Sequence, residues 1–144
     1  MDENLINSYA DIENQSSGQP ENKMPQNIEA EQSLIGSILF DNKVLEDLPP
    51  NFNNKYFFDP LHASIFEACI SLTDNGRLAD PLTLKNYLND AKLERDIDVE
   101  QYLLDLREGA LSLSKAVFYA EEIRNCYVRR SLVRIADELI DQSI

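Results

Sequence analysis

Hydrophobic residues recur at helical spacing along most of the chain after residue 24. The first helix is expected directly after Asn27, whose side-chain oxygen suits an N-cap, and Pro25 holds the residue before it in an extended conformation. Five apolar residues then fall on one helical face: Ile28, Leu34, Ile35, Ile38 and Leu39. The pattern predicts an amphipathic helix whose apolar face lies in a core.

Gly36 lies within this predicted helix, at a position where glycine is costly. A glycine in a helix interior is less favourable than alanine by about 1 kcal/mol. We therefore expect a neighbouring element to approach the helix closely at Gly36.

Three further helices are predicted, each beginning after an aspartate that can act as N-cap. They follow Asp59, Asp80 and Asp98, and the first two carry proline at the first helical position. Gly76 and Gly109 are expected to end the first and the third of them. A shorter helical turn is predicted over residues 44–48.

The aromatic residues ahead of the Asp59 helix are Phe52, Tyr56, Phe57 and Phe58. We expect them to fill the core rather than to stack on nucleic-acid bases.

No segment shows the alternation of apolar and polar residues that is typical of a strand. The predicted fold class is all-α, with a compact helical domain followed by an extended helix or a helical hairpin. Residues 1–24 are predicted to be a disordered acidic tail, because they carry too few large apolar groups to offset chain entropy. Residues 25–112 form the expected globular helical N-terminal domain. Residues 113–144 are expected to be a C-terminal helical hairpin, or the start of a linker, for self-association.

The C-terminal segment carries two apolar rows that point in different directions. The first row is Ala116, Ala120, Ile123 and Tyr127, and the second is Val128, Leu132, Ile135 and Leu139. At about 100° per residue the two rows are rotated by roughly 120° from each other. Either the chain breaks within residues 125–128, or one helix changes its packing partner there. Both alternatives suit an element that contacts another subunit.

This segment supplies the candidate residues for self-association or partner binding: Ile123, Tyr127, Val128, Arg130, Leu132, Ile135 and Leu139. Arg130 also belongs to a basic group with Arg124, Arg129 and Arg134. One interpretation of that group is a set of salt-bridge and helix-dipole partners on a long helix. The alternative is a docking surface for an acidic partner.

The formal net charge of −13 and the isoelectric point near 4.3 argue against a broad nucleic-acid surface, because an acidic domain repels phosphate. The two cysteines are far apart and read as reduced core thiols of a cytosolic protein. The N-terminus lacks the pattern of a signal peptide and no apolar run has membrane-spanning length. We therefore expect a cytoplasmic protein with no membrane partner.

The sequence also lacks the parts of an active site. His62 is the single histidine, so a histidine metal cluster or a Ser-His-Asp triad cannot form, and a packing or surface role is expected for it. The four glycines are isolated and form neither a phosphate-binding loop nor a dinucleotide fingerprint. No catalytic, cofactor-binding or metal-ligating residue is predicted in this chain.

Three blocks of the sequence resemble the N-terminal domain of bacterial replicative DNA helicases, the DnaB family. The first is "MPQNIEAEQSLIGSILFDN", similar to the Pro-x-Asn-x-Glu-Ala-Glu opening of that family. The second is "YFFDPLHASIFEACISLTDNGRLADPLTLKNYL", with a His-x-x-Ile-Phe helix followed by an Asp-Pro-x-Thr-Leu helix. The third is "FYAEEIRNCYVRRSLVRIADELI", similar to the Tyr-Ala helix of the family and its Arg-Arg-x-Leu-x-Arg continuation. The turn "ALSLSK" departs from the Pro-Ser-Ala-Ala-Asn of many members.

The resemblance implies that the full protein is a hexameric, ATP-dependent helicase that unwinds DNA during replication. It implies that this chain is the N-terminal collar domain, whose copies pair into dimers within the hexamer. It also implies docking of a DnaG-type primase and, in some systems, of a helicase loader. ATP and magnesium would act in a RecA-like domain that this chain lacks, and DNA would be bound by the full-length hexamer. The chain is thus expected to be an excised, non-catalytic part of the enzyme.

Two alternatives belong to other classes. A stand-alone helical adaptor for protein–protein interaction explains the composition and the periodicity equally well, but not the likeness of the three blocks. A small helical enzyme is disfavoured because no cluster of titratable residues converges.

Overall fold

The structure is a computed structural model that describes residues 24–89, 97–110 and 112–143. The chain divides into two compact units: a larger one, Gln26–Arg129, and a smaller one made of Met1–Pro25 and Arg130–Ile144. The predicted tail falls outside the described residues except at residue 24, so its predicted disorder stays a prediction, as do the predicted domain boundaries.

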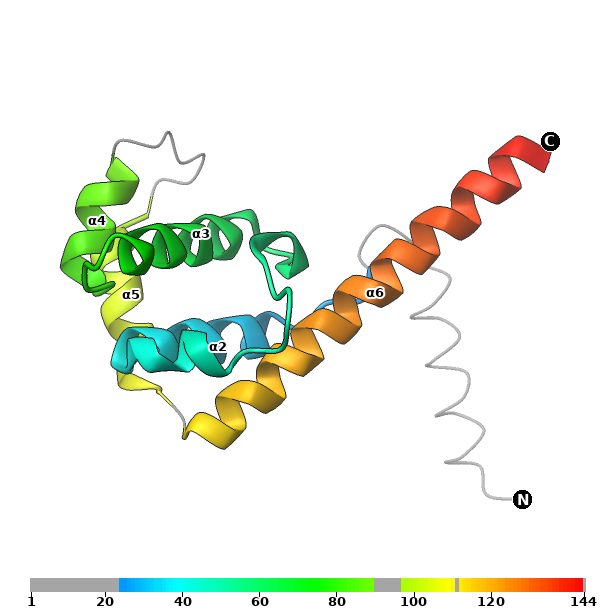
Figure 1. The fold of residues 1–144 in the computed structure, drawn as a ribbon. Helices are drawn as coiled ribbons and strands as arrows, with labels where there is room; N and C mark the ends of the chain where they lie inside the picture. Colours follow the sequence, from blue (N-terminus) through cyan, green and yellow to red (C-terminus); the bar gives the residue numbers. More distant parts are fainter. Residues whose placement is uncertain (1–23, 90–96, 111, 144) are drawn as a thin grey trace, which may run out of the picture. The chain divides into compact units, whose positions relative to one another are not determined.

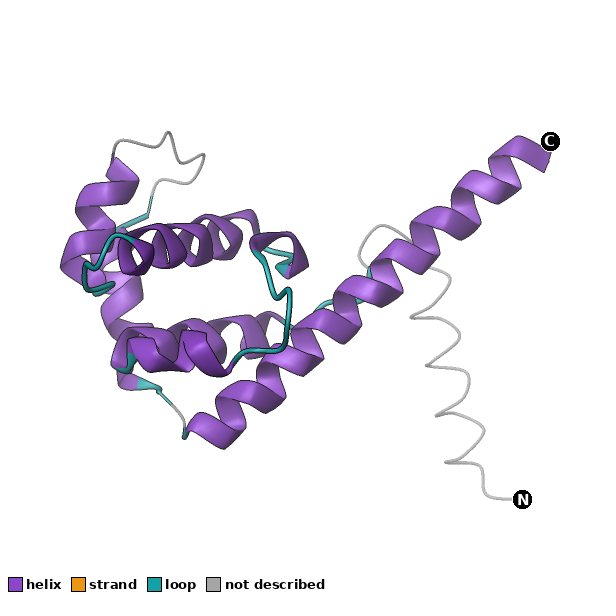
Figure 2. Cartoon of the chain, in the orientation of Figure 1, coloured by secondary structure: helices purple, strands orange, loops and turns teal. Residues whose placement is uncertain are grey.

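Helices and loops make up the described part of the chain (Figures 1 and 2), which confirms the all-α prediction. The elements in chain order are α2 (Ile28–Phe40), η2 (Asn42–Asp47), η3 (Asn54–Tyr56), α3 (Pro60–Asp74), α4 (Pro81–Asn89), α5 (Val99–Glu108) and α6 (Leu113–Ser143). The two η elements are 3₁₀ turns, and η2 covers most of the short helical turn predicted near residue 44.

The helices begin where the sequence supplies a side-chain acceptor for free backbone N–H groups. Asn27 accepts a hydrogen bond from Ala30 N at 2.9 Å, at the start of α2. Asp59 accepts from Leu61 N at 2.9 Å before α3, and Pro60 is the first residue of that helix. These caps are as predicted.

The two later helices have the same kind of start. Asp80 accepts from Thr83 N at 2.8 Å, and Asp98 accepts from Gln101 N at 3.1 Å. The Gln101 amide donates to Asp105 at 2.9 Å, one turn further along α5.

The helix ends differ in backbone conformation. Gly76 follows α3 with a φ of +72°, the left-handed conformation in which glycine is unstrained. Gly109 ends α5 with a φ of −86°, so the predicted stop is present without a left-handed residue.

The core of the larger unit forms around α2, whose apolar face is buried against α3 and α5. Figure 1 shows α2 and α3 side by side, with α4 and α5 across one end of the pair. The most deeply buried large side chains are mainly aliphatic: Leu34, Ile35, Ile38, Ile65, Phe66, Leu72, Leu84, Leu103 and Ile123. A contiguous apolar core of this kind is the main source of stability for a helical domain.

At Gly36 the backbone of α5 lies directly against α2. A Cβ built on Gly36 would overlap the carbonyl oxygen of Leu106 and lie 2.9 Å from its carbonyl carbon. A backbone carbonyl of a helix cannot move aside as a flexible side chain can. The predicted close approach at Gly36 is therefore confirmed, and α5 is the neighbouring element.

The aromatic residues before α3 fill the core only in part. Phe57 is buried and its ring centroid lies 5.2 Å from that of Phe66, while Phe52 contacts both rings edge-on. Phe58 is exposed, so the core assignment was wrong for this residue. Its backbone N–H is instead held by Glu31 Oε2 at 2.8 Å, which fixes the chain while the ring points outward.

The C-terminal segment is one helix, α6, with no break at residues 125–128. Of the two alternatives, the structure therefore has the extended helix. None of the described helices combines the length and the apolar character needed to cross a bilayer.

Candidate protein interaction site

The first apolar row of α6 is part of the core of the larger unit. Ala116, Ala120 and Ile123 are buried, and small alanines let the helix pack closely. Tyr127 is half-buried, and its ring centroid lies 4.9 Å from that of Tyr56 in a tilted arrangement. The first row is therefore packed against other residues of the same chain.

The second row of α6 is exposed to solvent. The exposed fractions are 44% for Val128, 59% for Leu132, 52% for Ile135 and 61% for Leu139. Single exposed apolar residues are ordinary, but a continuous row is typical of an interaction surface. We call these four residues the exposed row.

The rotation between the two rows has a simple physical reason. In the direction of the first row, the later part of α6 carries three charged residues, Arg134, Glu138 and Asp141, and all three are exposed. The apolar character moves to the exposed row over the same turns. The helix thus has one face that packs in its own core and, further along, another face that the described residues leave uncovered.

Two of the predicted interaction residues, Ile123 and Arg130, are buried within the chain, and a third, Tyr127, is half-buried. Ile123 belongs to the core row. Arg130 is also buried, and its Nη1 donates a hydrogen bond to Pro25 O at 2.8 Å. A side chain that is buried and bonded in this way is not displayed to a partner, so we restrict the candidate surface to the exposed row.

The basic group does not form one patch. Arg124, Arg129 and Arg134 are exposed, but at helical spacing they point in different directions around α6. This geometry favours separate solvated charges over a single docking surface for an acidic partner.

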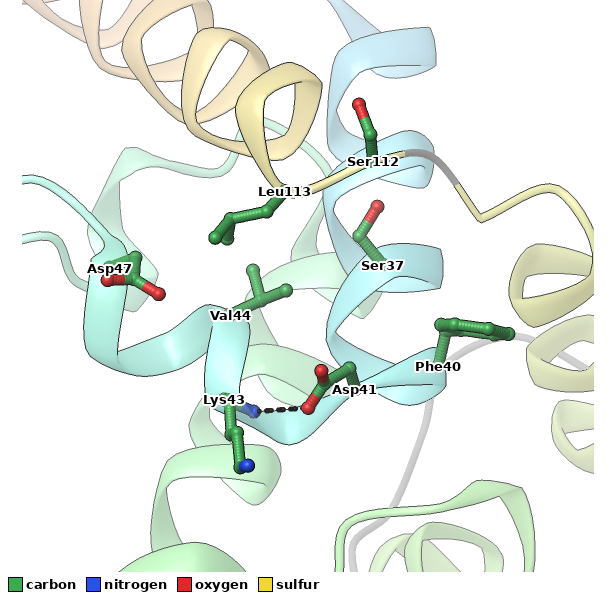
Figure 3. A pocket seen from close by; sticks show the side chains of 8 residues that line it. All are labelled: Ser37, Phe40, Asp41, Lys43, Val44, Asp47, Ser112 and Leu113. Carbon is green, nitrogen blue, oxygen red and sulfur yellow. Dashed lines mark hydrogen bonds between the residues drawn. The ribbon is translucent and has the colours of Figure 1, made fainter.

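The larger unit also has a pocket of about 300 Å³ (Figure 3). Its lining residues come from the end of α2, from η2 and from the start of α6: Ser37, Phe40, Asp41, Lys43, Val44, Asp47, Ser112 and Leu113. Phe40 and Leu113 form apolar walls, and Asp41 accepts a hydrogen bond from Lys43 N at 3.0 Å. The charged residues that line this pocket are Asp41, Lys43 and Asp47.

A chain of polar side chains crosses the core between α2, α3 and α5. Glu31 Oε1 lies 2.9 Å from His62 Nδ1, and His62 Nε2 lies 2.6 Å from the Tyr102 hydroxyl. Gln32 donates to the same hydroxyl at 3.2 Å. Glu31 also accepts hydrogen bonds from the backbone N–H groups of Phe58 and Asp59. We call Glu31, His62 and Tyr102 the buried triad.

The buried triad is suited to structure rather than to catalysis. Glu31 and His62 are 1% and 0% exposed, so a substrate has no access to them. A neutral imidazole can donate from Nδ1 to the Glu31 carboxylate and accept at Nε2 from Tyr102, which satisfies every member. His62 thus has a packing role, as predicted, and ties three helices together.

The burial of Glu31 was not predicted from the sequence. The position of Glu31 in the sequence nevertheless indicates this burial. Glu31 lies three residues after Ile28 and four before Ile35, in the middle of the apolar face of α2. A carboxylate on a core face requires buried donors, and the single histidine was available as one.

Cys69 and Cys126 are buried free thiols. Burial raises the pKa of the Cys69 thiol to about 12, so it is protonated and unreactive near neutral pH. Across the described stretches of the chain, no group of His, Cys, Asp and Glu residues is arranged to hold a metal ion.

Comparison with known proteins gives a consistent family. Residues 23–125 match the family described as the DnaB-like helicase N terminal domain. The replicative DNA helicase DnaB of Rickettsia felis is 30% identical over 120 residues, which are 83% of this chain and 24% of that protein. The corresponding protein of Rickettsia conorii is 28% identical over 145 residues, 99% of this chain and 29% of that protein. The chain thus spans about a quarter of the length of these curated relatives.

A solved structure agrees with the sequence matches. The crystal structure of the N-terminal domain of DnaB helicase from Mycobacterium tuberculosis aligns with a TM-score of 0.70 and 28% sequence identity. The alignment covers 83% of this chain and 86% of that one.

Proposed function

The chain belongs to the family of DnaB-like helicase N-terminal domains, and on that premise we propose that it is the assembly and docking domain of a replicative DNA helicase. In this proposal copies of the chain pair with one another and contribute to a hexameric collar. The observation that carries the assembly role is the exposed row of α6, four large apolar residues along one face of one helix. The proposed location is the cytoplasm, where replication of bacterial DNA takes place.

We propose a second copy of the chain as the occupant of the exposed row. Val128, Leu132, Ile135 and Leu139 follow one another at intervals of four, three and four residues, the spacing at which two helices bury a shared apolar seam. A surface with this period is complementary to itself. The net charge of −13 disfavours nucleic acid as the occupant.

The ATP chemistry of the proposed helicase does not fit the residues of this chain. The sequence has no Gly-x-x-x-x-Gly-Lys loop that could cradle phosphates. Gly36 contacts the α5 backbone, and Gly76 and Gly109 end helices. We therefore propose that ATP and magnesium are bound by other parts of the protein, and that DNA is bound by the full hexamer.

The proposal also includes docking of a DnaG-type primase and, where one is present, of a helicase loader. The acidic surface and the mixed apolar and polar pocket at Phe40 and Leu113 support a protein partner rather than a small substrate. Calorimetric titration of the chain with a DnaG-type primase tests the proposed docking. Saturable binding supports it, whereas no heat and no complex at high micromolar concentrations contradict it.

If ATP and DNA are bound outside this chain, the chain itself should bind DNA only weakly. We expect no ATP hydrolysis and no tight binding to single-stranded DNA, because the chain has a charge of −13 and no phosphate loop. Fluorescence anisotropy with a labelled oligonucleotide measures the binding, and an established single-stranded DNA-binding protein serves as positive control. Submicromolar binding at physiological salt would contradict the proposal.

A further inference from the structure

We propose that a segment of the chain's own N-terminus, residues 5–12, covers the exposed row of α6 and competes there with any second copy. The inference rests on the self-association proposed above and adds how it is regulated. It is carried by the point at which the N-terminal residues reach α6, by the pattern of their apolar side chains and by their charge.

The chain is fastened to α6 at Pro25, directly after the N-terminal residues. Arg130 is buried, and its Nη1 donates the hydrogen bond to the Pro25 carbonyl oxygen at 2.8 Å. Arg130 precedes Leu132 by two residues, about 3 Å along the helix axis. Residues 1–24 therefore start from a point beside the exposed row. They also belong to the same compact unit as its last three residues.

The linker between Pro25 and the proposed segment is long enough to let the segment reach the row. Residues 13–24 span roughly 20 Å on average as an unstructured chain and at most about 40 Å. From Val128 to Leu139 the row extends about 17 Å along the helix axis. A tether of this length keeps the segment at a high effective concentration beside the row, so that a weak contact suffices.

Residues 5–12 carry an apolar face that matches the row. Leu5, Ile6, Tyr9 and Ile12 follow one another at intervals of one, three and three residues, so on a helix they would share one face. They are the large apolar residues of positions 2–23. Such a segment is too small to fold alone, but it can become ordered when its apolar face is buried against a partner surface.

The charge of the segment also suits α6. Every charged residue between positions 2 and 22 is acidic. Arg124 and Arg129 are exposed on α6, and at about 100° per residue they lie on either side of the direction in which the row points. Each of these separate charges can pair with an acidic side chain of the segment, which favours the contact modestly because the groups stay solvated.

A covered row limits pairing between copies. Each copy must first release its own segment, so the apparent dissociation constant of a pair rises as the fraction of uncovered chains falls. The N-terminal segment thus holds the row closed to a second copy until the local concentration of chains is high.

The test compares Tyr9→Asp with Asn7→Asp in the full 144-residue chain by sedimentation equilibrium. Both substitutions add one negative charge, but Tyr9 lies on the apolar face of the segment and Asn7 on the opposite side at helical spacing. We expect Tyr9→Asp to uncover the row and to lower the dissociation constant roughly three- to tenfold, and Asn7→Asp to leave it nearly unchanged. Added negative charge alone predicts weaker association of both variants. A Tyr9→Asp variant that associates no more tightly than Asn7→Asp would overturn the proposal.

A second measurement is independent of self-association. In ¹H–¹⁵N NMR spectra recorded where the chain is monomeric, we expect the backbone amide signals of Leu132, Ile135 and Leu139 to move in Tyr9→Asp and to stay in place in Asn7→Asp. If the signals of these three residues are the same in the parent chain and in Tyr9→Asp, the segment does not cover the row.

The outcome is separable from that of the proposed function. If the parent chain and both variants remain monomeric at hundreds of micromolar, the assembly role fails, and the NMR comparison alone decides whether the segment covers the row. If the parent chain associates but Tyr9→Asp neither tightens association nor moves the α6 signals, the assembly role stands and the covering segment is overturned.

Discussion

Gly36 shows how a single residue sets the distance between two helices. Because its missing side chain lets α2 lie against the Leu106 carbonyl, even a methyl group has no room there. Helix propensity alone predicts that alanine would stabilise α2 by about 1 kcal/mol. Packing against the Leu106 carbonyl predicts instead that alanine would destabilise the domain.

We therefore expect Gly36→Ala to lower the free energy of unfolding by about 1–3 kcal/mol, and Gly36→Leu to lower it at least as much. Urea unfolding followed by circular dichroism measures the change. Gly109→Ala is the matched control, because a Cβ there would lie 3.6 Å from the Leu106 carbonyl oxygen, an ordinary van der Waals contact. The free energy of unfolding of this variant should change little. A Gly36→Ala variant as stable as the parent chain would contradict the close contact.

The buried triad gives a second prediction at the scale of residues. Tyr102→Phe removes the hydroxyl that bonds to both His62 and Gln32, and leaves the Nε2 atom of the buried His62 without this partner. We expect a loss of about 1–3 kcal/mol in the free energy of unfolding. Tyr87→Phe is the control, because the Tyr87 hydroxyl bonds to Ser71 at an exposed position, and its effect should stay within about 0.5 kcal/mol. Equal effects of the two substitutions would mean that the triad adds nothing specific.

At the scale of elements, the sequence predicted most of what the structure has. Helix starts at Asn27, Asp59, Asp80 and Asp98 followed from local chemistry, because a cap needs only residues within three positions of it. The sequence pattern did not predict that α6 is one continuous helix. Two apolar rows on one segment fit a break and a straight helix equally well, and only the packing of the first row distinguishes them.

Long-range contacts were the part that local patterns could not supply. The bond of Glu31 to His62 joins residues 31 positions apart, and Asn42 holds Ala79 through two hydrogen bonds across 37 positions. Periodicity indicates that a residue faces the core but not which residue it meets. For the same reason the hydrogen bond from Arg130 to the Pro25 carbonyl oxygen, 105 positions away, could not be predicted from the sequence.

At the scale of the whole molecule, we propose that the chain serves in assembly and docking. Its core is built from one face each of several helices, and the described part of α6 keeps an apolar row that this core does not use. Two copies of a chain with a charge of −13 repel each other, so we expect weak association that strengthens as salt screens the charges.

Sedimentation equilibrium of the parent chain beside Leu132→Asp and Ile135→Asp tests whether the exposed row binds a second copy. Leu78→Asp is the matched control, because Leu78 is as exposed as Leu132 but lies before α4, outside the row. We expect the parent chain and the Leu78 variant to associate as concentration rises, and the two variants of the row to stay monomeric. A parent chain that is strictly monomeric at hundreds of micromolar, or row variants that associate as well as the parent chain, would contradict this expectation.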